Sequence, residues 1–426
     1  MNPSFFRRRA LACELATLLV DADGERTARS GVMLTAPRGT GKSVFLNNDL
    51  AAALRHRGAV VIVADLAKHS DADPADLVAK AVLEALKAHE GVLARLARRV
   101  GLERIGFGGV SFLVSRPRSD GMWLSEALEA LSDMTQRPIV LILDEAQQCL
   151  TTPRGTSLLT VLKAARDSLN ISHYGMRIMA TGSHRAKLMT LLGRSKVFFC
   201  SKRISLPPLD GEFLDWFHRH HGLPASLGPD ALASLFRSAG YRPQVLTDAA
   251  LEVLSTGGFQ YGDATRILRR AIDRQSAEIH KDILEVIGRL PAMASAVVRV
   301  MATTDKTRAG FDPATMTVYA DVVRRIDPAW NGQVDVDGVE QALAVLASRR
   351  LVWKSTIGVY MLEDPLVVTA MRQAGLLDIV PPIPGVSPYE EASDDVGDDE
   401  AFPLWVGTCR QAFVAVSTAR WAPVDA

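Results

Sequence analysis

The sequence predicts an α/β fold. A mostly parallel sheet covered by helices on both faces would be followed by a helical lid and a C-terminal winged-helix domain. Three observations support this. Residues 1–210 contain short apolar runs without polar alternation, separated by segments of helical periodicity. Residues 211–290 have helical patterns throughout. Residues 291–378 contain three helical segments and then a hairpin pattern, which is the order of elements in a winged helix.

Four strands are expected in the first region, each a short apolar run that ends at glycine, proline or polar residues. They cover residues 31–36, 59–66, 138–150 and 176–184. Helices are expected between them, from the spacing of apolar residues and from capping residues such as Asp73. These cover residues 43–58, 73–89 and 123–136. Near the N-terminus Glu14 interrupts an apolar run and no small-residue cleavage site follows, which indicates an amphipathic helix rather than a signal peptide.

The remaining chain divides by composition. Residues 351–364 predict the hairpin, with Gly358 near its turn. The sequence then becomes rich in proline and afterwards strongly acidic, which indicates a disordered linker. We therefore expect an α/β core at 1–210, a helical lid at 211–290, a winged-helix domain at 291–378, an acidic linker at 379–402 and a C-terminal tail at 403–426.

Composition limits the partners. The chain has 426 residues, of which 48% are hydrophobic and 23% charged, as in an ordinary globular protein. Its formal net charge of +1 gives no bulk reason to expect nucleic acid or an anionic membrane as a partner. The apolar runs are too short to span a bilayer. The four cysteines lie far apart and lack metal-ligand spacing, which favours a reducing, cytoplasmic compartment.

Residues 36–44, between a predicted strand and a predicted helix, have the composition of a phosphate-binding loop of the G-x-x-x-x-G-K-[ST] pattern. Glycines let backbone N–H groups converge on phosphate oxygens, and the following helix directs its positive end at the anion. Lys42 would reach the terminal phosphates, and the Ser43 hydroxyl would hold Mg²⁺. Ala36 stands where the pattern has its first glycine, a departure of one methyl group. The expected cofactor-binding residues are Pro37, Arg38, Gly39, Thr40, Gly41, Lys42, Ser43 and Val44.

Two adjacent carboxylates follow the apolar run at 138–143. Asp144 would belong to the Mg²⁺ shell together with Ser43. Glu145 would polarise the water that attacks the γ-phosphate. An ordinary turn and a capping carboxylate are the alternatives, but the loop and the carboxylates in combination favour a nucleotide site.

Three further positions are candidates. The strand at 176–184 ends in polar residues, so Thr181 or Ser183 would contact the γ-phosphate or the water, with a strand-end turn as the alternative. Arg185 and Arg194 follow, and we select Arg194 as an arginine finger for a neighbouring subunit's nucleotide. Arg242 stands just before a helix of the predicted lid, from which it would reach the phosphates. For both arginines a plain surface or loop position is the alternative.

These motifs resemble those of P-loop ATPases of the AAA+ superfamily, in its archaeal-type, STAND-like group. The similar stretches are FFRRRALACEL, LTAPRGTGKSVFL, VVIVADL, IVLILDEAQ, RIMATGSHRAKLM and SLPPLDGEF, then GYRP in the lid and GVYMLEDPLV in the winged helix. The resemblance covers residues 4–370. It implies binding of ATP and Mg²⁺, slow hydrolysis of ATP to ADP and phosphate, and a nucleotide-driven switch between lid and core.

Two outputs stay open. One is a signalling switch whose winged helix is an internal packing module. The other is a DNA-acting ATPase of replication initiation, transposition or mobile-element control, since families that resemble this chain share the layout. The third helix of the winged helix, which would enter the major groove, begins with Asp335, Asp337 and Glu340, and these carboxylates would face phosphates. A homo-oligomer and a protein partner are both compatible with the sequence. A protein that binds ATP without hydrolysing it is a third option, against which Glu145 argues.

Overall fold

The computed structural model describes residues 5–20, 30–68, 71–88, 120–183, 187–188, 190–191, 198, 201–304, 309–354 and 359–383. The chain divides into two compact units, Met1–Leu206 and Pro207–Ala426. Each unit has a hydrophobic core of its own. Among the described helices, none combines the length and the apolar character that crossing a bilayer requires.

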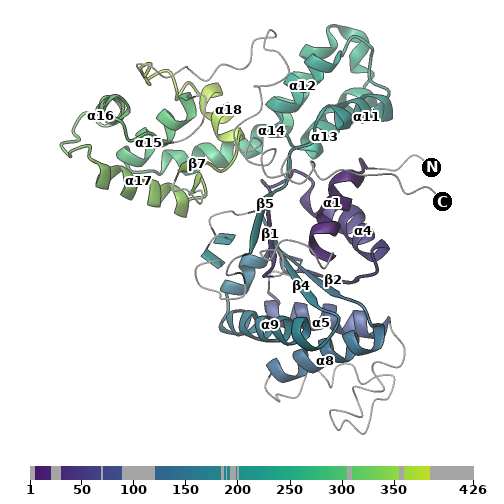
Figure 1. Ribbon diagram of the computed structural model, residues 1–426. Helices are drawn as coiled ribbons and strands as arrows, with labels where there is room; N and C mark the ends of the chain where they lie inside the picture. Colours follow the sequence, from purple (N-terminus) through teal and green to yellow (C-terminus); the bar gives the residue numbers. More distant parts are fainter. Residues whose placement is uncertain are drawn as a thin grey trace, which may run out of the picture. The chain divides into compact units, whose positions relative to one another are not determined.

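The first unit is built on a five-stranded parallel sheet with the order β2-β3-β4-β1-β5 (Figure 1). Its strands are β1 Val32–Thr35, β2 Val60–Asp65, β3 Ile139–Asp144, β4 Met176–Gly182 and β5 Lys202–Ser205. The first four confirm the strands predicted from the sequence, although the strand expected at 138–150 ends at Asp144 and continues as a 3-10 helix. The sequence did not predict β5. It is an edge strand in which only Ile204 is buried, so it has no apolar run.

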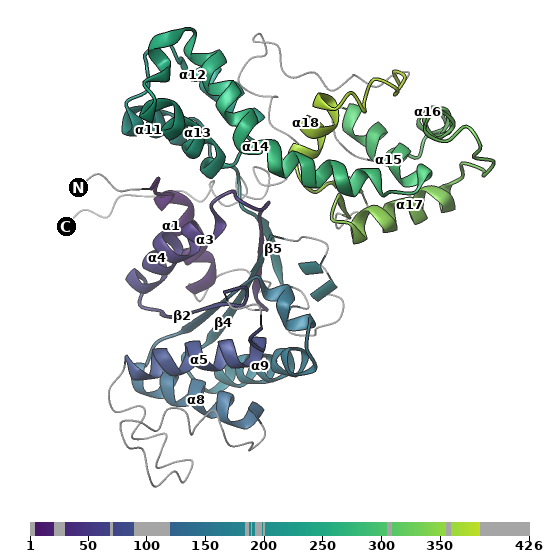
Figure 2. The same ribbon diagram turned by 180° about the vertical axis from the view of Figure 1, so that it is seen from behind.

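Helices cover both faces of this sheet, as the unbroken apolar strands require. All six residues of β3 are buried. The helices of the unit are α1 Arg9–Val20, α3 Lys42–Val44, η1 Phe45–Leu50, α4 Ala51–His56, α5 Pro74–Lys87, α8 Asp120–Thr135, η2 Ala146–Leu150 and α9 Pro153–Ser172. Helices α1 and α4 lie on one side of the sheet, and α5, α8 and α9 lie on the other (Figures 1 and 2). The fold class that the sequence predicts is therefore confirmed for this unit.

The register of the strands brings their carboxyl ends to one edge of the sheet. Asp65 at the end of β2 pairs with Asp144 at the end of β3. Thr35 at the end of β1 pairs with Gly182 at the end of β4. In open parallel sheets this edge is where ligands bind, because the loops that leave the strands meet there.

The second unit is helical, with one short hairpin. Its helices are α11 Gly211–His221, α12 Pro229–Ser238, α13 Pro243–Ser255, η4 Gly258–Tyr261, α14 Ala264–Gly288, α15 Ala292–Thr303, α16 Pro313–Ile326, α17 Val336–Ser348 and α18 Leu366–Gln373. Several begin with proline at the first position or with an aspartate cap, as at Asp210, Asp263 and Asp312. These signals explain why the sequence predicted most of the helices.

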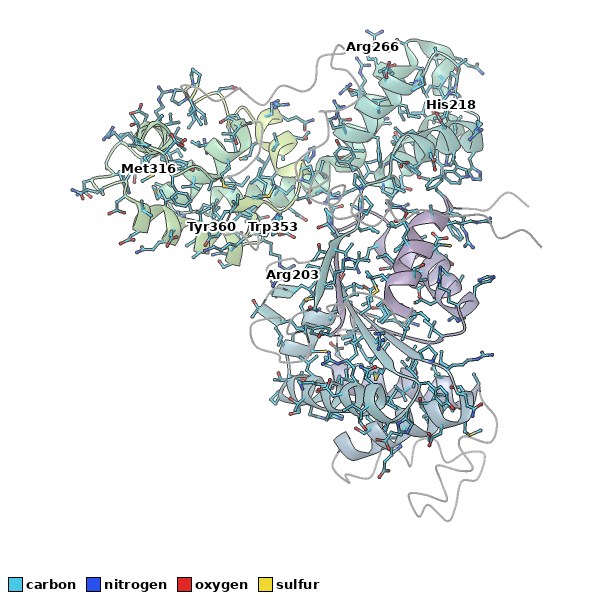
Figure 3. All side chains as sticks on the ribbon, viewed as in Figure 1. Arg203, His218, Arg266, Met316, Trp353 and Tyr360 are labelled. Atoms are coloured by element: carbon cyan, nitrogen blue, oxygen red, sulfur yellow. The ribbon has the colours of Figure 1, made fainter. Side chains whose placement is uncertain are left out.

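The hairpin consists of β6 Val352–Lys354 and β7 Tyr360–Leu362, paired antiparallel. Trp353 and Tyr360 mark its two strands in Figure 3. It follows α15, α16 and α17, and all three helices share one core with both strands and with α18. Three helices and a hairpin confirm the winged-helix pattern, whereas α18 was not predicted. Gly358 and the acidic linker from residue 384 onward lie outside the described residues.

Candidate nucleotide-binding site

The loop that leaves β1 has the backbone of a phosphate-binding loop. Gly39 and Gly41 have φ angles of 82° and 86°, in the left-handed region that L side chains rarely adopt. A Cβ at Gly41 would meet no atom within 4 Å, so the backbone conformation, rather than crowding, requires glycine there. The Thr40 hydroxyl donates a hydrogen bond to the Pro37 carbonyl oxygen at 2.8 Å, which closes the loop on itself.

Ala36 replaces the first glycine of the loop pattern without strain. Its backbone is not left-handed, and its side chain is fully buried. Its N–H donates to the Gly182 carbonyl oxygen at 3.4 Å, which ties the start of the loop to the end of β4. The extra methyl group is therefore accommodated in the interior.

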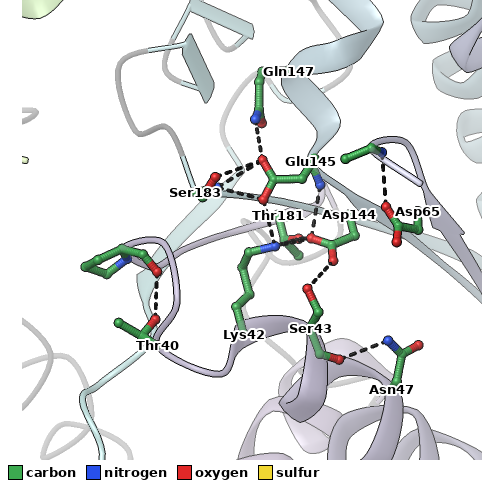
Figure 4. Close-up of polar contacts among 12 residues, drawn as sticks. Thr40, Lys42, Ser43, Asn47, Asp65, Asp144, Glu145, Gln147, Thr181 and Ser183 are labelled. Carbon is green, nitrogen blue, oxygen red and sulfur yellow. Dashed lines mark hydrogen bonds and ion pairs between the residues drawn. The ribbon is translucent and has the colours of Figure 1, made fainter. Parts of the chain in front are cut away.

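Lys42 is the centre of the site (Figure 4). It starts the helix after the loop, and its side chain is buried. Its ammonium pairs with Asp144 and lies 3.1 Å from the Glu145 carboxylate. It also donates to the Thr181 hydroxyl at 3.4 Å. The side chains of β3 and β4 that the sequence placed at strand ends therefore meet the loop lysine.

Asp144 gathers the groups expected around a magnesium ion. The Ser43 hydroxyl donates to its Oδ2 at 2.8 Å, and the Thr181 hydroxyl donates to its Oδ1 at 2.5 Å. Hydroxyl and carboxylate oxygens are the ligands that Mg²⁺ takes from proteins, with phosphates and waters completing its shell. The residues present therefore fit the ion that the sequence predicted.

Glu145 occupies an unusual backbone position. Its φ is +56°, in the left-handed region, and the 3-10 helix η2 begins at the next residue. Its carboxylate accepts hydrogen bonds from the Ser183 N–H at 3.2 and 3.3 Å and from the Ser183 hydroxyl at 3.0 Å. The Gln147 side-chain amide donates to it at 2.5 Å. A strained backbone and several fixed donors together hold this carboxylate in one orientation.

The charges of the site favour ionised carboxylates. Burial raises the pKa of Asp144, but the charge of Lys42 and the hydrogen bonds outweigh it, so the pKa lies below its ordinary value. Burial likewise raises the pKa of Glu145, and Lys42, Gln147 and Ser183 bring it below its ordinary value. One ammonium therefore faces two ionised carboxylates at neutral pH. The excess of negative charge favours binding of a cation at this site.

The N-terminal segment is attached to the helix that follows the loop. Asp49, buried in the π-helical turn η1, lies 3.1 Å from the Arg7 guanidinium and accepts a hydrogen bond from the Arg8 N–H at 3.1 Å. The Arg8 guanidinium lies over the Phe45 ring, 5.8 Å from its centroid. These contacts fix the helix that carries Lys42 and Ser43. The FFRRR stretch thus has a structural role beside the site.

The structure brings together most of the residues predicted for the site. The loop residues Pro37–Val44 form one turn and helix start, with Arg38, Ser43 and Val44 exposed. Arg242 lies in the second unit, where it is buried, precedes α13 and pairs with Asp364. Its contact with nucleotide stays a prediction. Arg185 and Arg194 lie outside the described residues, so the arginine finger also stays a prediction.

Sequence reasoning missed two features of the site. Gln147 donates to Glu145, and nothing in its spacing indicated this. The sequence offers Ser183 only as an alternative to Thr181, but the two have different partners in the structure: Thr181 contacts Asp144, and Ser183 contacts Glu145.

The parallel sheet, its strand order and the loop after β1 are typical of the core of a P-loop AAA domain. Residues 25–189 match the sequence profile of the AAA domain family, so the first unit contains an AAA domain. No curated protein sequence matches the chain.

Among solved structures, the chain is similar to a Walker-type ATPase of Pyrococcus abyssi, with 18% identity and a TM-score of 0.53 over 86% of this chain and 96% of that one. The ORC2 protein of Aeropyrum pernix, solved with ADPNP and ADP, is 16% identical, with a TM-score of 0.47 over 87% and 94%. The ORC1 protein of the same organism, solved with DNA, is 18% identical, with a TM-score of 0.35 over 89% and 96%. At 18% identity the likeness to the Pyrococcus abyssi ATPase concerns the fold alone.

Proposed function

We propose that the protein is an ATP-driven molecular switch of the STAND type that hydrolyses ATP slowly with Mg²⁺. The AAA domain supports ATPase activity. The observation that carries the proposal is the convergence of Lys42, Ser43, Asp144 and Glu145 at the carboxyl edge of the sheet, all within contact distance of one another or of a shared partner. The separated cysteines of the sequence make the cytoplasm the proposed compartment.

Each side chain has a role in this chemistry. The Lys42 ammonium would leave its carboxylate partners for the terminal phosphates. Ser43 and Asp144 would hold Mg²⁺, which when bound neutralises charge on the phosphate oxygens. Glu145 would orient and polarise the attacking water. Thr181, which fixes one Asp144 oxygen, would keep that carboxylate aimed at the ion.

The output would pass through the second unit. We assign the helical lid to residues 211–290 and the winged helix to residues 291–378. Within this unit, the loop of residues 239–242 before α13 is in close contact with residues 364–366 at the start of α18. A Cβ at Gly240 would lie 2.5 Å from the Leu366 side chain, and Arg242 pairs with Asp364. Two such contacts support transmission of a lid movement to the winged helix. The predicted contact of Arg242 with nucleotide would require its guanidinium to leave Asp364.

A DNA-acting ATPase is the second function, and exposed basic side chains favour it. Arg349, Arg350 and Lys354 are exposed at the end of α17 and in β6. Against it, Asp337 and Glu340 are exposed in the first turns of α17, where a recognition helix would meet the DNA. The switch is therefore the function that we prefer.

The proposal is tested by two measurements on the full chain. Phosphate release from ATP is followed with Mg²⁺ and with excess chelator, and activity is expected only with the metal. Hydrogen exchange of the second unit is then compared without nucleotide, with ADP and with a non-hydrolysable ATP analogue. A switch predicts that the segments around Arg242 and around Asp364 exchange at different rates with ADP and with the analogue. Identical exchange in all three states contradicts the switch, and absence of metal-dependent phosphate release contradicts the hydrolysis.

A further inference from the structure

Glu145 is held by donors from two segments of the chain. The Ser183 N–H and hydroxyl of the chain after β4 donate to it, at 3.0 to 3.3 Å. The Gln147 amide, two residues further along the same turn, donates to it at 2.5 Å (Figure 4). The Gln147 side chain thus joins the ring of contacts around the carboxylate to which we assign the water.

The backbone of Gln147 is anchored firmly enough to hold its side chain in place. Gln147 belongs to η2, whose residues Ala146 and Cys149 are fully buried in the core of the first unit. The side chain of Gln147 itself is only 8% exposed. The amide can therefore not rotate freely into solvent, and its direction is set by the packing around it.

Gly182 provides the space in which the Gln147 amide lies. A Cβ at Gly182 would stand 2.4 Å from the Gln147 Oε1, closer than atoms approach. The backbone of Gly182 is not left-handed, so alanine is compatible with its conformation. Glycine is required at this position only to leave room for the side chain of Gln147. An added methyl group would meet the end of the Gln147 side chain, so it would displace the amide from Glu145 rather than the strand from the sheet.

The stability of the fold does not explain this arrangement. The Gln147 Oε1 is buried and has no hydrogen-bond partner among the described residues. A buried acceptor without a partner costs free energy of folding, which an apolar side chain of the same size would avoid. A polar group kept at such a cost beside a reactive carboxylate points to a role in the site.

We propose that Gln147 is a positioning residue for ATP hydrolysis, which keeps the Glu145 carboxylate aimed at the attacking water, and that Gly182 has no side chain so that Gln147 can do so. The proposal rests on the proposed function of Glu145. Gln147 acts through Glu145, and it is not assigned a contact with nucleotide. Nucleotide binding therefore does not depend on it.

The test compares Gln147→Ala, Gly182→Ala and the double variant with the wild type, with Gln148→Ala as matched control. Gln148 neighbours Gln147 in η2 but is half-exposed, and it is not among the residues that we assign to the site. We expect kcat to fall roughly tenfold in Gln147→Ala, the rate equivalent of one hydrogen bond, while the dissociation constant for ATP stays unchanged. Gly182→Ala should lower kcat similarly, because its methyl group displaces the amide. The double variant should be no slower than Gln147→Ala, since the displaced group is already gone.

The comparison of kcat with ATP affinity separates positioning from a merely structural effect. Gln147→Ala and Gly182→Ala should lower kcat while the dissociation constant for ATP keeps its wild-type value, and Gln148→Ala should change neither. Gln147→Met, which keeps the volume and removes the donor, gives the same test if Gln147→Ala does not fold.

A wild-type kcat in Gln147→Ala or Gln147→Met, or a fall in kcat that comes with an equal loss of ATP affinity, overturns the proposal. If the reductions in kcat caused by Gly182→Ala and by Gln147→Ala multiply in the double variant, the role of Gly182 is wrong. Glu145→Gln distinguishes this failure from failure of the proposed function. If Glu145→Gln abolishes hydrolysis while the Gln147 variants remain fully active, only the positioning role is wrong. If Glu145→Gln is itself fully active, the role of Glu145 is wrong.

Discussion

The Lys42 ammonium lies 3.1 Å from the Glu145 carboxylate while it also pairs with Asp144. The site's one lysine is therefore shared by the two carboxylates that we assign to the metal and to the water. Phosphates would compete with both for the ammonium, and Mg²⁺ would compete with Lys42 for Asp144. Binding of ATP and binding of Mg²⁺ would therefore be linked. ATP would draw Lys42 away from Asp144 and free that carboxylate for the ion, and the ion would free Lys42 for the phosphates.

Replacement of Lys42 by alanine should weaken ATP binding at least tenfold, about 1.4 kcal/mol, because the backbone N–H groups of the loop do not replace its point charge. The measurement is a titration with fluorescent ATP. Lys163→Ala is the matched control, since Lys163 is a partly exposed lysine in the same unit that pairs with Asp167. Unchanged affinity in a folded Lys42→Ala protein would refute the phosphate-binding loop.

The pair of Arg242 and Asp364 should stabilise the second unit. Their side chains are 10% and 22% exposed, so Asp364→Ala leaves a largely buried guanidinium without this partner. We expect the free energy of unfolding to fall by about 1–3 kcal/mol, measured by denaturant titration. Asp364→Asn should cost less, because its side-chain oxygen can still accept the Leu366 N–H, as Asp364 does at 3.0 Å.

The matched control for this pair is Asp321→Ala. Asp321 pairs with Arg324 at 3.5 Å, and the Arg324 and Asp321 side chains are 65% and 47% exposed. Exposed pairs of this kind contribute little, so the free energy of unfolding should change by less than about 1 kcal/mol. If Asp321→Ala and Asp364→Ala lower the free energy of unfolding equally, the Arg242–Asp364 pair contributes no more to stability than an exposed pair.

The winged helix should not bind duplex DNA in an ATP-dependent manner. The exposed carboxylates of Asp337 and Glu340 would repel phosphates at the start of α17. A labelled duplex is titrated at two salt concentrations, with and without ATP. The variant Asp337→Asn/Glu340→Gln, which removes both charges, should bind more tightly than the wild type at low salt. Salt-sensitive binding by the wild type that needs ATP would favour the DNA-acting ATPase.

Much of the fold follows from local sequence patterns, and the exceptions have physical causes. Buried parallel strands such as β3 are continuous apolar runs, which the sequence displays directly. The edge strand β5 lacks such a run, because only Ile204 is buried. Helix α9 was missed although its signals are present: Thr152 caps it, and buried residues such as Leu158, Leu162 and Leu169 recur at helical spacing.

The site was predictable where motifs fix it and unpredictable where it depends on distant packing. Lys42, Ser43, Asp144 and Glu145 stand at fixed positions relative to their strands, so the pattern located them. Gln147 is different. Its contact with Glu145 needs the left-handed backbone of Glu145 and the empty space at Gly182 on another strand. No single stretch of sequence carries that information.

Replacement of Glu145 by glutamine decides whether the chain hydrolyses ATP or only binds it. Glutamine keeps the shape and an oxygen that can accept the Ser183 N–H, but it removes the charge that polarises the water. General-base assistance is typically worth about 10²–10⁴-fold in rate. Phosphate release should therefore slow by at least about a hundredfold while ATP and Mg²⁺ still bind.

The matched variant of this last test is Asp144→Asn, because Asp144 and Glu145 are adjacent carboxylates with different partners. Asp144 accepts a hydrogen bond from the Ser43 hydroxyl, and we assign both side chains to Mg²⁺. Asp144→Asn removes the carboxylate charge, so it should weaken the Mg²⁺-dependent part of ATP binding, measured by titration with and without chelator. Glu145→Gln should leave that part unchanged and accumulate the ATP-bound state. Wild-type turnover in Glu145→Gln would mean that another group activates the water. Absence of hydrolysis in the wild type itself would reduce the protein to an ATP-binding switch.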